Sequence, residues 1–192
     1  MKKTIWLPIV IGLVAGGLNY MTWAVDFKIP IPTAAGGYMG MMEIFNILTA
    51  ALGGPIAAVI DDLLYGIGGH LAIRPILPWP ESLYISIADI IAHLVAMLAA
   101  AFCYRFLYER ARQKPLAFFT GWVLIVAIYY CVFLSPLQVF LVNIASPGFI
   151  PSYISYLIGT GPEILLTTVM TTLVMIALPL YSRHPLWYER KA

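Results

Sequence analysis

Charged residues are scarce in this chain of 192 residues, because Asp, Glu, Lys and Arg together make up only 10% of it. Soluble domains usually carry roughly 25% charged residues. Apolar residues account for 61% of the chain, which is more than a soluble protein of this length could bury. The composition therefore excludes an ordinary soluble domain and indicates a protein whose surface lies in a lipid bilayer.

Residues that usually build metal and catalytic sites are also rare. The chain has three histidines, too few for a two-haem cytochrome with four imidazole ligands, and two cysteines, Cys103 and Cys131. Both cysteines fall within expected membrane spans, where they act as small apolar residues. No Gly-x-Ser-x-Gly, His-Glu-x-x-His or Gly-x-x-x-x-Gly-Lys-Ser/Thr motif is present. We therefore expect no metal site, no cofactor and no enzymatic activity, and the net charge of +2 does not suggest nucleic-acid binding.

Long hydrophobic runs predict an all-α integral membrane bundle that forms one transmembrane domain over residues 1–192. The run from Pro115 to Pro162 contains no Asp, Glu, Lys, Arg or His. It is too long for one crossing, since about 20 residues span the hydrocarbon, and Asn143–Pro151 has the composition of a turn. The pattern predicts six transmembrane helices, at about residues 4–25, 38–52, 55–73, 81–108, 116–142 and 153–181.

The basic residues predict that the N and C termini are both cytoplasmic. In this orientation nine of the eleven Lys and Arg residues lie inside, and only Lys28 and Arg74 lie outside. One alternative concerns segments 38–52 and 55–73, which are glycine-rich and joined by a Gly-Gly-Pro turn without a basic residue. These two segments could instead form a re-entrant hairpin, which would leave four full crossings.

Ionisable side chains at membrane depth are costly, so each is a candidate for function. Ser82, Ser86, Asp89 and His93 follow one another at steps of four, three and four, which places them on one face of a helix. A carboxylate one turn from an imidazole can pair with it. Such a pair suits ligand binding, proton transfer or a purely structural contact.

The remaining acidic residues allow structural roles as well. Asp61 and Asp62 point about 100° apart on a helix, so we expect one to face the bundle and the other to reach the inner interface. Glu43 and Asn46, near the outer end of the second helix, suit ligand contact or helix capping. The sixth helix begins either near Tyr153 or, more sharply, at Pro162. In the second case Glu163 lies in its first turn, where a carboxylate is expected to cap it.

Aromatic and polar residues gather where the predicted loops face outward, a composition that suits binding of a small, planar, polar ligand. Interfacial anchoring explains the Trp and Tyr residues among them equally well. The group comprises His70, Arg74, Trp79, Glu81, Tyr84, Gln138, Asn143 and Tyr153. On the first helix, Gly12 and Gly16 have the spacing that allows close helix packing, either inside the bundle or against a partner subunit.

The segment Gly53–Gly66, GGPIAAVIDDLLYG, resembles a feature of the substrate-binding S components of energy-coupling factor (ECF) vitamin transporters. These proteins have a Gly-Pro turn, a helix of small residues and a following Asp-Leu. The size, topology and small-residue strip agree across most of the chain. The first helix departs from the family, since Gly12 and Gly16 stand where many members have alanines. No motif specific for biotin, riboflavin, thiamine, folate or cobalamin is present.

The resemblance implies a multi-pass protein of a prokaryotic cell membrane that captures a vitamin or its precursor from outside. Its partners would be a transmembrane coupling subunit, docked through Gly12 and Gly16, and two ATPase subunits. The substrate contacts implied are Tyr38, Glu43, Asn46, His70, Arg74, Trp79, Asp89, His93, Asn143 and Tyr153. Two alternatives remain: a membrane sensor or partner-binding module without transport activity, and an enzyme with Asp89–His93 or Asp61–Asp62 as an acid/base pair.

Overall fold

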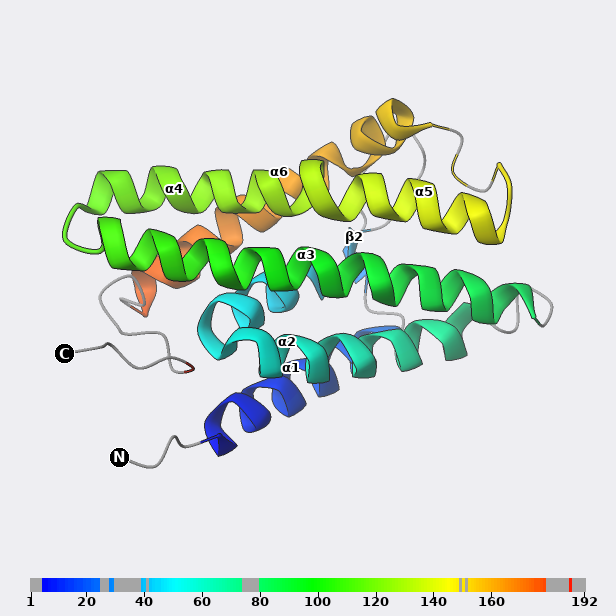
Figure 1. Ribbon diagram of the computed structural model, residues 1–192, viewed down its shortest axis with the longest axis horizontal. Helices are drawn as coiled ribbons and strands as arrows, with labels where there is room; N and C mark the ends of the chain where they lie inside the picture. The colour runs from blue at the N-terminus through cyan, green and yellow to red at the C-terminus, as the bar shows by residue number, and fades with distance from the viewer. Residues whose placement is uncertain are drawn as a thin grey trace.

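The computed structural model describes residues 5–24, 28–29, 39–40, 42–73, 80–148, 150, 152–178 and 187, most of them helical. The helices are α1 (Trp6–Ala24), α2 (Met42–Ile73), α3 (Glu81–Ala111), α4 (Pro115–Ile128), the π-helix η1 (Tyr129–Leu134), α5 (Ser135–Ala145) and α6 (Tyr153–Ala177) (Figure 1). Two short strands, β1 (Lys28–Ile29) and β2 (Met39–Gly40), pair in antiparallel register.

Helix α3 lies at the centre of the bundle and contacts α2, α4, η1 and α5 (Figure 1). Helices α4, η1 and α5 follow one another as a continuous rod beside α3, and α1 packs against α2. Helix α6 contacts α2, α4 and α5. This arrangement brings side chains from α1, α2, α3, η1, α5 and α6 into one polar interior, described below.

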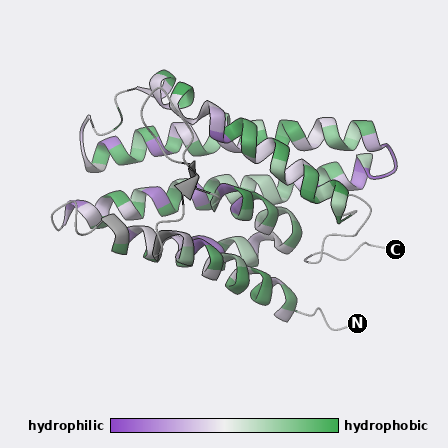
Figure 2. Ribbon diagram, turned by 180° about the vertical axis from the view of Figure 1, so that it is seen from behind, coloured by the Kyte–Doolittle hydropathy of each residue, from purple (hydrophilic) through white to green (hydrophobic). Residues whose placement is uncertain are grey.

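The described helices are those of a multi-pass membrane protein, and the all-helical class predicted from composition is confirmed. Four stretches are long and apolar enough to cross a bilayer: Met42–Leu71, Glu81–Ala111, Pro115–Ile144 and Tyr153–Ala177. The apolar part of α1, Trp6–Thr22, is shorter. Hydrophobic residues cover most of the ribbon, with a hydrophilic turn between α3 and α4 (Figure 2). The count of six crossings goes beyond these four helices and stays a prediction.

Helix α2 changes direction at Gly54, where the Gly-Gly-Pro sequence predicts a turn. Gly54 has φ 71° and ψ −163°, a conformation that residues with a Cβ rarely adopt. The Trp187 side chain packs over it and donates a hydrogen bond from Nε1 to the carbonyl of Ala51 at 3.2 Å. The first arm, before Gly54, is only about 18 Å long at 1.5 Å per residue, compared with a hydrocarbon core of about 30 Å. The six-crossing prediction and the re-entrant alternative for residues 38–52 and 55–73 differ in how they place this short arm.

The close approach of α1 to α2 depends on two glycines. A Cβ at Gly12 would lie 2.8 Å from the carbonyl oxygen of Ala57, and one at Gly16 would lie 2.8 Å from Leu64 Cδ1 and 3.0 Å from the Cα of Asp61. Both glycines are therefore occupied by contacts inside the bundle. This favours bundle packing over partner docking for Gly12 and Gly16.

The π-helix η1 lies within the predicted crossing at residues 116–142. The sequence pattern did not predict this interruption of the α-helix. Pro136 lacks the N–H that an α-helix would direct at the carbonyl of Val132, so the helix widens in the preceding turn. The Cys131 carbonyl, inside η1, accepts a hydrogen bond from the Tyr153 hydroxyl at 2.7 Å. Tyr129, the first residue of η1, is fully buried in the interior.

Candidate functional site

The imidazole of His93 on α3 is the centre of the polar interior and is 1% exposed. Its Nε2 lies 2.8 Å from Glu43 Oε1 of α2, and its Nδ1 lies 2.9 Å from the carbonyl oxygen of Asp89 and 3.4 Å from Asp89 Oδ1. The two residues of the predicted Asp89–His93 pair therefore lie together, and Glu43 joins them. Because both ring nitrogens face oxygen atoms, the doubly protonated imidazolium satisfies both sides of the ring.

Glu43 lies in the first turn of α2 and is buried. Its Oε2 accepts hydrogen bonds from the hydroxyl of Tyr129 in η1 and, at 3.4 Å, from Asn46 Nδ2. The expectation that Glu43 contacts a ligand or caps a helix omitted this role, in which one carboxylate connects α2 to α3 and η1.

Asn19 extends the network to α1. Its Nδ2 donates to Asn46 Oδ1 and to Asp61 Oδ1, each at 2.7 Å, and all three residues are fully buried. The sequence offers one signal for Asn19, which is an amide within an apolar helix, where polar side chains often bond across helices. Sequence reasoning did not identify it.

Asp61 and Asp62 are both fully buried, so the expectation that one of them reaches the inner interface is wrong. The close packing of α2 against α1 and α3 covers both sides of this turn. Asp61 is bonded by Asn19, but in the part of the chain that the structure describes neither oxygen of Asp62 has a hydrogen-bond partner. A buried carboxylate without a donor is destabilising.

Asp89 connects the network to α5 and α6. Its Oδ1 accepts from Gln138 Nε2 at 2.6 Å and its Oδ2 accepts from the Tyr65 hydroxyl at 3.0 Å. The Gln138 Oε1 in turn accepts from the Tyr156 hydroxyl. Each oxygen of Asp89 is thus held by a neutral donor from a neighbouring helix.

A cavity of about 270 Å³ opens beside Asp89, between α2, α3, α5 and α6. The Asp89 side chain is 26% exposed, and Ser86 and His70, whose Oγ and Nδ1 lie 3.2 Å apart, contribute further polar groups. The complete lining is Tyr65, Gly66, Gly69, His70, Ile85, Ser86, Asp89, Gln138, Val142, Ile150 and Tyr156. A mostly apolar cavity with a few converging polar groups has the character of a small-molecule site.

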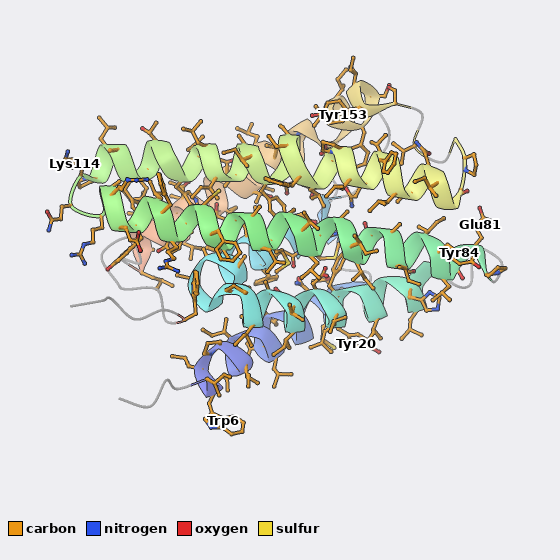
Figure 3. The ribbon with its side chains drawn as sticks, in the orientation of Figure 1. Trp6, Tyr20, Glu81, Tyr84, Lys114 and Tyr153 are labelled. Carbon is orange, nitrogen blue, oxygen red and sulfur yellow. The ribbon has the colours of Figure 1, made fainter. Side chains whose placement is uncertain are left out.

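The cavity lies in the half of the bundle near the start of α3. Figure 3 places Glu81 and Tyr84 at this end and Lys114 and Trp6 at the opposite end. The lining residues Ile85, Ser86 and Asp89 belong to the first turns of α3. The basic α3–α4 turn and the cavity are therefore at different ends of the molecule.

The predicted ligand contacts divide into separate groups in the structure. Glu43, Asn46, Asp89 and His93 belong to the polar network, and His70 and Asp89 line the cavity. Tyr38, Arg74 and Trp79 lie outside the described residues.

Asn143 and Tyr153 lie apart from that cavity and line a second, more open hollow of about 460 Å³ along α5. Asn143 also exchanges two hydrogen bonds with the backbone of Ile150, at 2.7 and 3.0 Å, and so orders the turn that leads to α6. Asn143 therefore has a structural role in the turn.

Of the two starts expected for the sixth helix, the one at Tyr153 is confirmed and the one at Pro162 is wrong, so Glu163 does not cap this helix. Helix α6 begins at Tyr153, and Ser152 caps it by accepting a hydrogen bond from the Ser155 backbone N–H at 3.1 Å. Glu163 lies mid-helix, where its Oε1 accepts from the Tyr130 hydroxyl at 3.3 Å. In the sequence, the signal for a helix that starts at Tyr153 is Ser152, a residue type that favours the N-cap position.

No protein-family model matches this chain, and neither does any curated protein or any solved structure.

Proposed function

We propose that this protein is the membrane-embedded substrate-binding subunit of an ECF-type importer, and that it captures a vitamin or a similar small molecule from outside the cell. The observation that carries the proposal is the cavity beside Asp89, where side chains from four helices converge. Ionisable groups inside a membrane protein are costly, so the presence of Asp89 and His70 in the cavity wall favours a functional role.

The proposed orientation is that of a prokaryotic plasma-membrane protein with six crossings and cytoplasmic termini. The α3–α4 turn carries Arg110, Arg112 and Lys114, which the positive-inside bias places in the cytoplasm. The cavity is lined by residues near the start of α3, and Figure 3 shows that Glu81 at this start and Lys114 lie at opposite ends of the bundle. In the proposed orientation the cavity therefore faces the outside. Substrate capture from outside follows from that position.

ATP-driven uptake by this subunit requires partners, since the sequence has no phosphate-binding Gly-x-x-x-x-Gly-Lys-Ser/Thr motif. We propose a transmembrane coupling subunit and two ATPase subunits in these roles. Because Gly12 and Gly16 pack against α2, docking of the coupling subunit would use other residues.

The proposal is tested on the purified full chain in lipid nanodiscs. Mass spectrometry should detect a small molecule that co-purifies, and a panel of vitamins should include one that raises the melting temperature by mass action. Asp89→Asn should weaken that shift, whereas Glu109→Gln should retain it, because Glu109 lies at the other end of α3 and its side chain is 47% exposed. A folded protein that neither carries nor responds to any small molecule would contradict the proposal.

A further inference from the structure

We infer that the cavity selects a ligand carrying a positively charged nitrogen, which Asp89 receives. This inference rests on the proposed binding function and specifies the chemical class of the ligand. It follows from the charges on the cavity wall, the contacts that fix them and the size of the space.

Asp89 is the acidic residue among the lining side chains, and the lining that the structure describes includes no Lys or Arg. Its two oxygens are held in place by Gln138 and Tyr65, which are neutral donors and do not themselves offset the negative charge. The carboxylate is therefore preorganised beside an open space, and 26% of its side chain is accessible. A carboxylate has about four acceptor positions, so a further donor from a ligand can be accommodated.

Among the described residues, the imidazolium of His93 forms an ion pair with Asp89 and shares its charge with a second carboxylate. His93 Nε2 lies 2.8 Å from Glu43 Oε1 while its Nδ1 faces Asp89 at 3.4 Å. The group of Glu43, His93 and Asp89 thus has two negative charges for one imidazolium. An excess charge in a bundle surrounded by lipid is costly, and a ligand cation at Asp89 makes the group neutral.

The aromatic lining suits the same class of ligand. Tyr65 and Tyr156 both border the cavity, and their rings can contact a cation or stack on a planar ring that carries it. Gly69, also in the lining, adds no side chain to the α2 wall. The volume of about 270 Å³ lies just below the usual range of ligand pockets, which limits the ligand to a small molecule of one or two rings.

The test uses three probes that share one ring and differ in charge: benzylamine, benzyl alcohol and benzoate. Their binding to the full chain in nanodiscs is measured by calorimetry and by thermal shift at neutral pH. Benzylamine should bind at least tenfold more tightly than benzyl alcohol, and benzoate should bind most weakly. In Asp89→Asn this preference should fall below threefold, whereas Glu109→Gln, which changes an exposed acid on the same helix, should keep it.

The inference is overturned if benzyl alcohol or benzoate binds as well as benzylamine, if none of the three binds, or if the preference persists in Asp89→Asn. The wild-type series decides the matter even if the Asp89 variant fails to fold. A neutral or anionic molecule that co-purifies with the protein would overturn this inference and leave the proposed function in place. Absence of both probe binding and a co-purified molecule would overturn both.

Discussion

The Nε2 atom of His93 lies 2.8 Å from Glu43 Oε1, so the middle of α3 is joined to the first turn of α2. Fifty residues separate the two along the chain. Through this contact, a continuous chain of hydrogen bonds and ion pairs connects Asp89, at the cavity, with Tyr129 and Asn46. It therefore links the shape of the cavity to the packing of the bundle.

Replacing Glu43 by Ala should destabilise the protein strongly, because it leaves a buried imidazole without its nearest carboxylate. Loss of one partner from a buried ion pair typically costs about 3–5 kcal/mol. Glu109→Ala is the matched control, since the Arg105–Glu109 pair is exposed and such pairs contribute about 1 kcal/mol or less. Unfolding in detergent, followed by circular dichroism, measures both; equal losses would contradict a structural role for Glu43.

Asp62→Asn should raise the melting temperature. The buried Asp62 carboxylate has no hydrogen-bond partner among the described residues, and the amide has the same shape without the charge. Asp61→Ala should act in the opposite direction and cost about 1–3 kcal/mol, because it removes an acceptor of the Asn19 amide. If Asp62→Asn lowers stability, this carboxylate has a partner that the described residues do not supply.

Gly16→Ala should destabilise the isolated protein by about 1–3 kcal/mol through overpacking. Its Cβ would lie 2.8 Å from Leu64 Cδ1 and 3.0 Å from the Asp61 backbone, and backbone cannot move aside cheaply. Gly17→Ala is the neighbouring control, since nothing lies within 4 Å of its Cβ and alanine favours a helix by up to about 1 kcal/mol. Thermal melts of both variants decide between bundle packing and partner docking. If Gly16 served docking alone, Gly16→Ala would leave the melting temperature of the isolated protein unchanged.

Gly54→Ala should disrupt the bend of α2. A Cβ there would lie 2.2 Å from the Trp187 ring, and φ of 71° is strained for alanine. Gly161→Ala, in a helical position with nothing within 4 Å of its Cβ, is the control. We expect a lower melting temperature and higher Trp187 accessibility to quenchers in Gly54→Ala only; unchanged fluorescence quenching would show that Trp187 does not depend on this glycine.

The sequence by itself determined the class of protein and most of its helices. Low charge and long apolar runs leave lipid as the only solvent for such a surface, and every backbone group must then be paired within a helix. The pairing of Asp89 with His93 was also predictable, because residues four apart on a helix are neighbours. The break before Pro55 followed from Gly-Gly-Pro, whose conformational preferences are local.

Only the tertiary structure decided which distant residues meet. The contacts of Glu43 with His93 and of Asn19 with Asp61 depend on how the helices are rotated and shifted against one another. Hydrophobic periodicity does not define that register here, since apolar residues cover nearly every face of these helices. The cavity beside Asp89 arises in the same way, because Tyr65, Gln138 and Tyr156 belong to three different helices and converge only when the bundle is packed.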